Sequence, residues 1–427
     1  MSAAIIFVLL LVLMLTGMPI SISLGLTVLT FLFTMTDVPI ESVALKLFTG
    51  IEKFEIMAIP FFILAGNFLT HGGVARRMIN FATSMVGHWY GGLGLGGVMA
   101  CALFAAVSGS SPATVVAIGA ILLPAMVRQG FPKKFGAGVI TTSGALGILI
   151  PPSIVMVMYS VSTNTSVGAL FMAGVVPGLL LAVFLGVTTW YRARKFDYPR
   201  QPKASWGERL KAFKESAWGL FLIVVVMGGI YTGIFTPTEA AAMSAVYAFF
   251  VAVFVYKDLG MKDVPKVLLN SANMSAMLLY IITNAVLFSF LLTHENIPQA
   301  MADFMIGTGV GLIGFLIMAN ILMLIAGNFM EPSSIVLILA PILFPIATKL
   351  GIDPVHFGII MVVNMEVGMC HPPVGLNLYV ASGITKMGIS ELTVAVWPWL
   401  LSMLVFLILV TYVPDISLFL PRALGMM

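Results

Sequence analysis

Charged residues are scarce in this chain: of its 427 residues 9% are charged, whereas 60% are apolar and the mean hydropathy is +1.09. Because soluble domains typically carry about 25% charged residues, this composition excludes a soluble protein. Strand-like alternation of the kind that a lipid-facing barrel needs is also missing. The apolar runs are long enough for helices to cross a hydrocarbon core of about 30 Å. The sequence therefore predicts an all-α integral membrane protein embedded in a lipid bilayer.

Signatures of several other function classes are missing as well. The two cysteines, Cys101 and Cys370, lie in apolar segments, where packing or lining of a ligand pocket is favoured over a disulfide. No Gly-x-x-x-x-Gly-Lys-Ser/Thr loop occurs, which argues against an ATP-driven pump. His294-Glu295 has no second His at the spacing of a zinc-protease helix. We therefore expect no enzymatic activity and no catalytic residues.

The basic residues that are present gather in one place. Eight of the 21 Lys and Arg residues lie between Arg192 and Lys214. Short segments rich in Lys and Arg stay in the cytoplasm, so this cluster is interpreted as an orientation signal. No nucleic-acid partner is expected, although the formal net charge is +4. The sequence predicts a cytoplasmic basic loop over residues 192–216 that divides the chain into two halves.

Each half contains the same helix-breaking pattern, about 220 residues apart. The first copy runs from residues 107–112 to 147–152, and the second from 327–332 to 368–373. Interrupted backbone at mid-membrane depth is tolerated only where it is buried in protein or lines a cavity. Duplicated broken helices are typical of secondary transporters, whereas a channel would need a continuous polar pore.

Counting crossings outward from the basic loop predicts two re-entrant hairpins. Residues 91–127 start and finish in the cytoplasm and turn at 108–112, whereas residues 308–349 start and finish outside and turn at 328–332. Five predicted crossings separate the two hairpins, and an odd number makes the repeats inverted. At the N-terminus, Gly17-Met18-Pro19 divides residues 3–36 into two spans, with one long kinked helix as the alternative.

Taken together, these motifs resemble those of a known family. Residues 17–19, 108–112, 150–152, 329–332 and 371–373 are similar to motifs of the DctM-like M subunit of tripartite ATP-independent periplasmic (TRAP) transporters. The resemblance implies an inverted-repeat, elevator-type, sodium-coupled importer of organic anions in the bacterial inner membrane, with C4-dicarboxylates or sialic acid as substrates.

The resemblance also implies two partners. These are a small Q-type membrane subunit, expected as a separate chain, and a soluble periplasmic substrate-binding protein. The alternative is a one-component sodium/carboxylate symporter of related architecture, which would need neither partner.

The predicted division of the chain follows the repeats. It comprises N-terminal scaffold helices (1–90), a first transport repeat (91–191), the basic loop (192–216), further scaffold helices (217–307), a second transport repeat (308–413) and a C-terminal tail (414–427).

Where a helix is interrupted, free carbonyl groups suit a cation and free amide groups suit a carboxylate. In each repeat a hairpin tip is expected to face a Pro-Pro break, so we predict one Na⁺ site per repeat, supported by the resemblance. The first site would use Ser108, Ser110, Gly147, Ile150 and Pro152, and the second would use Asn328, Gly368, His371 and Pro373.

A substrate carboxylate is expected between the two tips. The tip and break segments contain no Lys or Arg, so amide and hydroxyl groups would hold it. The candidate residues are Ser111, Thr114, Ser153, Glu331 and Asn377. Glu331 has a structural alternative, because it precedes Pro332 and is placed to cap a helix. Glu366, deep in an apolar segment, would couple protons or stabilise the broken helix.

Overall fold

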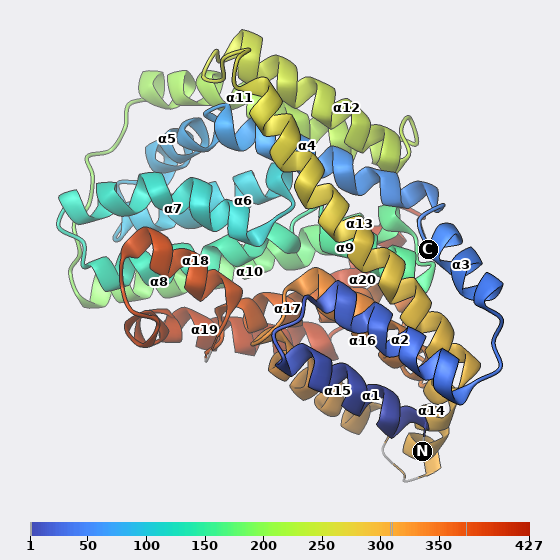
Figure 1. The fold of residues 1–427 in the computed structure, drawn as a ribbon. Helices are drawn as coiled ribbons and strands as arrows, with labels where there is room; N and C mark the ends of the chain where they lie inside the picture. Colours follow the sequence, from blue (N-terminus) through green and yellow to red (C-terminus); the bar gives the residue numbers. More distant parts are fainter. Residues whose placement is uncertain (1, 308, 310, 373) are drawn as a thin grey trace.

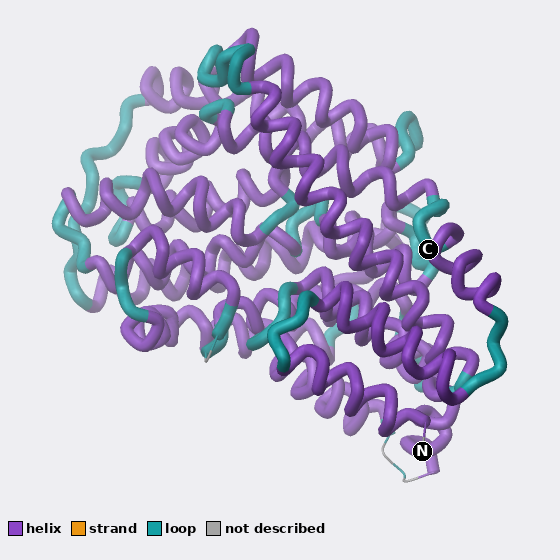
Figure 2. Tube along the Cα trace, in the orientation of Figure 1, coloured by secondary structure: helices purple, strands orange, loops and turns teal. Residues whose placement is uncertain are grey.

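A computed structural model describes residues 2–307, 309, 311–372 and 374–427 (Figure 1). Figure 2 shows that these residues form helices joined by loops, with no strand among them. Within the described residues, eight helices are long and apolar enough to cross a membrane. The predicted all-α membrane fold is confirmed.

The helices of the first half come in the following order. They are α1 (Ser2–Leu15), α2 (Ile20–Met35), α3 (Ile40–Thr49), the 3₁₀ turn η1 (Phe54–Met57), α4 (Ala58–His71), α5 (Val74–Val86), α6 (Gly92–Ser108), α7 (Ser111–Arg128), α8 (Lys133–Ser143), the 3₁₀ turn η2 (Gly144–Ile148), α9 (Ile154–Thr163) and α10 (Val167–Lys195).

The second half continues in the same way. Its helices are α11 (Trp206–Tyr231), α12 (Pro237–Phe250), the π-helical turn η3 (Val251–Val255), α13 (Val264–His294), α14 (Ile297–Gly307), α15 (Leu312–Gly327), α16 (Pro332–Lys349), α17 (Pro354–Cys370), α18 (Leu376–Thr385), α19 (Ile389–Tyr412) and α20 (Asp415–Ala423).

Both predicted hairpins are present, and local chemistry explains their turns. Only Gly109 and Ser110 separate α6 from α7, and Gly109 has a left-handed φ of +61°, which glycine adopts without strain. Pro112 lies in the first turn of α7, where its missing N–H has no helical partner to lose. In the second hairpin, Glu331 caps α16 and Pro332 begins it. We call residues 108–112 the first tip and residues 328–332 the second tip.

Both predicted broken helices are also present, although they differ in form. In the first half, α8 passes into the 3₁₀ turn η2, and residues 149–153, here called the first break, lie outside any helix before α9 begins. In the second half, α17 stays α-helical to Cys370, without a 3₁₀ turn, and α18 begins at Leu376. At the N-terminus, α1 and α2 are separate helices on either side of Gly17 and Pro19.

The two repeats pack into one another. Figure 1 shows the orange and red helices α17–α19 beside the cyan and green helices α6–α10, and α19 packs against both α8 and α10. The Trp399 indole donates a hydrogen bond of 2.8 Å to the Thr189 hydroxyl, and the Tyr159 hydroxyl donates one of 2.7 Å to the Pro354 carbonyl. Helices α4, α5, α11, α12 and α13 pack with one another outside this body.

Two segments that were expected to be loop or tail are largely helical. Of the basic segment, residues 196–205 alone lie outside helices, because Ser205 and Glu208 form a capping box that begins α11 at Trp206. The C-terminal segment contains α20, which packs against α10 and α17. Ser417 of α20 lies 2.7 Å from the His356 ring nitrogen Nδ1, which ties the C-terminus to the second repeat.

Candidate functional site

The first tip and the first break touch through their backbones. A Cβ atom added to Gly147 would lie 2.5 Å from the Ser110 carbonyl oxygen, and one added to Gly109 would lie 2.8 Å from the Pro152 carbonyl oxygen. Real Cβ atoms do not approach so closely, so these two contacts require glycine. The fold therefore places the backbone of the first tip against η2 and the first break.

Two hydroxyl groups complete this cluster of oxygens. The Ser108 and Thr114 hydroxyl oxygens are 2.9 Å apart, and Thr114 donates a hydrogen bond of 2.8 Å to the Ser110 carbonyl. Thr114, predicted to contact substrate, thus lies with the residues of the first predicted ion site. The side chain of Ile150 points elsewhere and packs against Gly178 of α10.

In the second repeat, Asn328, Gly368 and His371 come together. The backbones of α15 and α17 touch at Gly327 and Gly368, where an added Cβ on Gly368 would lie 2.8 Å from the Gly327 Cα. The Asn328 amide lies 2.9 Å from His371 Nδ1, 3.1 Å from the His371 carbonyl and 3.2 Å from the Pro372 carbonyl. With its nitrogen facing these three acceptors, the amide donates hydrogen bonds to them. Pro373, the remaining predicted ligand, lies outside the described residues.

The two repeats meet at Ser111 and Asn377. The Asn377 amide nitrogen donates a hydrogen bond of 2.7 Å to the Ser111 hydroxyl, and that hydroxyl is 3.1 Å from the Asn377 amide oxygen. Both side chains are fully buried. Because they come from α7 and α18, this pair joins the first hairpin to the second broken helix.

The same pair has two neighbours that the sequence interpretation did not place there. The Asn377 nitrogen lies 3.4 Å from the Thr141 carbonyl and 3.7 Å from the Cys370 sulfur, and the Cys370 thiol donates to the Thr141 carbonyl at 3.5 Å. Cys370 was expected to pack or to line a pocket. Thr141 carried a weak signal, since it opens the buried polar run Thr141-Thr142-Ser143 directly ahead of η2.

The other two substrate candidates make local hydrogen bonds. Ser153 donates a hydrogen bond of 2.6 Å to the Ile148 carbonyl and caps α9 by accepting from the Met156 amide. Glu331 accepts hydrogen bonds from the Ser334 amide at 3.2 Å and the Ser334 hydroxyl at 3.1 Å. Both residues act as helix caps in this structure. For Glu331, capping is the alternative to a substrate contact that the sequence analysis named.

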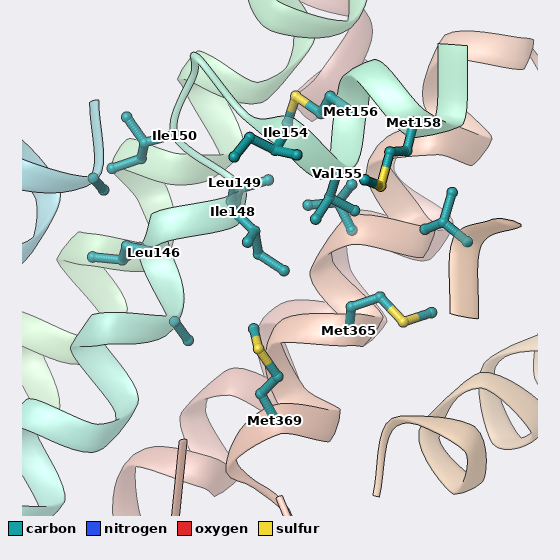
Figure 3. Packing of buried hydrophobic residues seen from close by; sticks show 14 of the residues in the cluster. Leu146, Ile148, Leu149, Ile150, Ile154, Val155, Met156, Met158, Met365 and Met369 are labelled. Carbon is teal, nitrogen blue, oxygen red and sulfur yellow. The ribbon is translucent and has the colours of Figure 1, made fainter. Parts of the chain in front are cut away.

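The first break is enclosed by apolar side chains. Figure 3 shows Ile148, Leu149 and Ile154 from this region together with Met365 and Met369 of α17. All five are buried. An ion that reached the carbonyl groups here would therefore exchange its water for protein oxygens.

Interrupted helices facing two hairpins define the architecture of a membrane transporter. The crystal structure of the Alcanivorax borkumensis YdaH transporter has a similar fold, with a TM-score of 0.59 and 17% sequence identity over 90% of this chain and 88% of that one.

Sequence comparison identifies the family. A family model described as "Tripartite ATP-independent periplasmic transporter, DctM component" matches residues 7–416. The chain is 79% identical to the C4-dicarboxylate TRAP transporter large permease protein DctM of Rhodobacter capsulatus, over 100% of both chains. It is 37% identical to the sialic acid TRAP transporter large permease protein SiaM of Vibrio cholerae, over 96% of both. The chain belongs to the DctM family of TRAP transporters, and it is a transporter subunit and not an enzyme.

Proposed function

We propose that this chain is the permease subunit of a sodium-driven importer of C4-dicarboxylates. The observation that carries this proposal is the buried Ser111–Asn377 pair, which joins the two repeats beside carbonyl clusters of a kind that suits sodium. The name of the relative at 79% identity supports C4-dicarboxylates over sialic acid, which is named for a relative at 37%.

The first sodium ion would lie between the first tip and the first break. Hydroxyl oxygens of Ser108 and Thr114 and carbonyl oxygens of Ser110 and Pro152 gather there, and all are uncharged. Hard cations prefer such oxygen ligands. Gly147 would contribute indirectly, because its missing side chain lets the Ser110 carbonyl approach the broken helix.

The second sodium ion would lie at Asn328. With its nitrogen inward, the Asn328 amide donates to the His371 and Pro372 carbonyls. When the amide turns, its oxygen faces those two carbonyl oxygens, which is unfavourable without a cation between them. A bound sodium ion would stabilise the turned amide, so this side chain would report occupancy of the site.

The substrate carboxylate would bind at Ser111 and Asn377. In the structure these groups satisfy each other, and separating them leaves one hydroxyl and one amide N–H as donors to a carboxylate. No cation faces the pair among its described hydrogen-bond partners, which are the Thr141 carbonyl and the Cys370 sulfur. Selectivity would accordingly be set to a large extent by a periplasmic substrate-binding protein.

Transport would proceed by movement of one rigid body against a scaffold. The two repeats, 91–191 and 308–413, are tied by Ser111–Asn377 and by Trp399–Thr189, and α20 of the tail packs with them. Residues 1–90 and 217–307 would form the scaffold, extended by a separate Q-type small subunit. With residues 192–216 in the cytoplasm of an inner-membrane protein, Lys53 and Asn164 lie on the periplasmic side.

Uptake into proteoliposomes tests the proposal. The chain is reconstituted with its Q-type small subunit, with and without the binding protein, and radiolabelled succinate is added under an imposed sodium gradient. We expect uptake to require all three components and sodium. Uptake by this chain alone would instead support the one-component symporter, and uptake without sodium would contradict both carbonyl sites as coupling sites.

A further inference from the structure

A cavity lies away from the two tips, between the repeats and the scaffold, and its largely apolar lining includes two lysines. Its volume is about 270 Å³. Helices α3 and α13 contribute its scaffold side, and α9 and α16 contribute its other side. In the proposed orientation this cavity opens toward the periplasm, because the ends of α9 and α13 that line it are the ends remote from the basic segment. We call it the outer cavity.

The outer cavity is positively charged. Lys46 and Lys53 both line it, together with the hydroxyl groups of Thr49, Ser162, Ser289 and Thr293, and no acidic side chain is among its lining residues. Within the described part of the chain, neither lysine forms an ion pair. The Lys46 ammonium lies 5.4 Å from the centroid of the Phe290 ring, which is also in the lining.

Lys53 is held in place by neutral acceptors from the first repeat. Its ammonium group donates hydrogen bonds of 2.6 Å to the Val161 carbonyl and 2.7 Å to the Asn164 amide oxygen. Lys53 precedes the apolar span that begins at Phe54, and partial burial lowers its pKa, an effect that the nearby Glu55 carboxylate opposes in part. An anion beside it would stabilise the charged form of this lysine, since neutral acceptors offset only part of the desolvation cost.

We propose that the outer cavity is a second anion site, in which Lys46 and Lys53 bind the carboxylates of a small organic dianion before it reaches Ser111 and Asn377. Two ammonium groups with surrounding hydroxyls match two carboxylates, and a cavity of this volume suits a four-carbon chain. The order of the two sites, with the outer cavity occupied before Ser111 and Asn377, rests on the proposed function. Binding of a dianion in the outer cavity does not depend on it.

Cysteine protection measures binding at this site without requiring transport. Ser289 lines the outer cavity and is partly exposed, whereas the native residues Cys101 and Cys370 are fully buried. In the purified full chain carrying Ser289→Cys, we expect succinate to slow alkylation by a maleimide and neutral succinamide to have no effect. Lys46→Gln or Lys53→Gln should raise the half-protective succinate concentration by roughly tenfold, as expected for one lost charge-assisted hydrogen bond.

Three control variants show whether protection depends on charge inside the outer cavity. Lys46→Arg keeps the charge and should retain protection, and Lys262→Gln removes an exposed charge outside the cavity and should leave protection unchanged. Protection should persist without sodium and in Asn377→Ala, which disables the proposed Ser111–Asn377 site. Loss of protection in Asn377→Ala would overturn the proposal, because the cysteine would then be reporting the other site.

Two further outcomes separate the outer site from lipid binding and from the proposed function. Protection that follows the content of phosphatidylglycerol in the preparation, and not succinate, would show that the lysines bind lipid phosphates and would overturn the proposal. Protection by succinate together with failed uptake in proteoliposomes would support the outer site while contradicting the proposed function.

Discussion

At the residue scale, Glu366 shows how the fold accommodates an acidic side chain inside the membrane. It is fully buried in α17, and neither carboxylate oxygen has a hydrogen-bond partner among the described residues. A charged carboxylate without a partner there would cost several kcal/mol. The symmetry-related residue is Ala145, which is consistent with a structural role.

A substitution separates the two roles that were considered for Glu366. Because a carboxyl group is nearly isosteric with an amide, a structural role predicts that Glu366→Gln retains sodium-dependent uptake within about twofold and unfolds at the same temperature. Uptake rates in proteoliposomes and thermal unfolding of the purified chain measure this. If uptake is lost while unfolding is unchanged, Glu366 transfers a proton.

Glu331 differs from Glu366 because its carboxylate accepts hydrogen bonds from Ser334. Its carboxylate caps α16 through Ser334, so Glu331→Ala should destabilise the chain by about 0.5–2 kcal/mol. A lower thermal unfolding temperature, with wild-type sodium affinity in the remaining folded protein, is the expected result. A changed sodium or succinate affinity at unchanged stability would show that Glu331 contacts a ligand.

At the element scale, four prolines of the two repeats lie inside helices without interrupting them. Pro124 lies inside α7 and Pro345 inside α16, and Pro177 and Pro398 lie inside α10 and α19. Membrane helices tolerate a single proline because neighbouring groups satisfy the freed carbonyl. The helices are interrupted where Pro-Pro coincides with a hairpin tip that packs against it. The pattern in the sequence therefore marks the repeats, and packing selects the breaks.

Contact between tip and break predicts a sharp effect of one methyl group. Gly147→Ala would place a Cβ 2.5 Å from the Ser110 carbonyl, so the first tip must move away and the oxygen cluster must widen. Such overpacking costs about 1–3 kcal/mol, which corresponds to a roughly 10- to 100-fold higher half-saturating sodium concentration for uptake.

Gly228→Ala in α11 is the matched control, because nothing lies within 4 Å of its added Cβ. Its sodium dependence should equal that of the wild type. An unchanged sodium dependence in Gly147→Ala would show that the first tip and break do not bind the coupling ion.

At the scale of the whole molecule, the question is which parts move. Hydrogen bonds between repeats, such as Ser111–Asn377 and the Thr188–Ser402 contact of 2.5 Å, link α7 to α18 and α10 to α19. The body and the scaffold also touch, since α5 packs against α6 and Lys53 donates hydrogen bonds to Val161 and Asn164. Elsewhere between them lie cavities. One of them has an apolar lining that includes Leu103 of α6 and Met227 of α11. The proposed movement of the repeats along the scaffold would take place across this boundary.

Cross-linking tests this division. Joining Leu103→Cys to Met227→Cys with a short bismaleimide connects the body to the scaffold and should abolish uptake. Joining Thr188→Cys to Ser402→Cys connects two helices within the body and should leave at least half of the uptake. Uptake that survives both cross-links would contradict movement of the repeats as one body against this scaffold.

The hairpins and the breaks could be predicted from the local sequence. Each depends on local chemistry: Gly-Ser-Ser-Pro cannot continue a helix, Pro-Pro removes two amide donors, and apolar runs must span the bilayer. The helix N-caps at Ser153 and Ser205 also depend on local sequence. The sequence does not predict them clearly, because one hydroxyl residue before an apolar run is a weak signal.

Which of these segments meet depends on tertiary packing. The side chain of Thr114 joins Ser108 and not Asn377, that of Ile150 packs away from the first tip, and Lys46 and Lys53 come to line one cavity. Each of these outcomes depends on how a helix rotates about its axis and on which neighbour it packs against. Those quantities follow from the packing of side chains far apart in the chain, which no local pattern encodes.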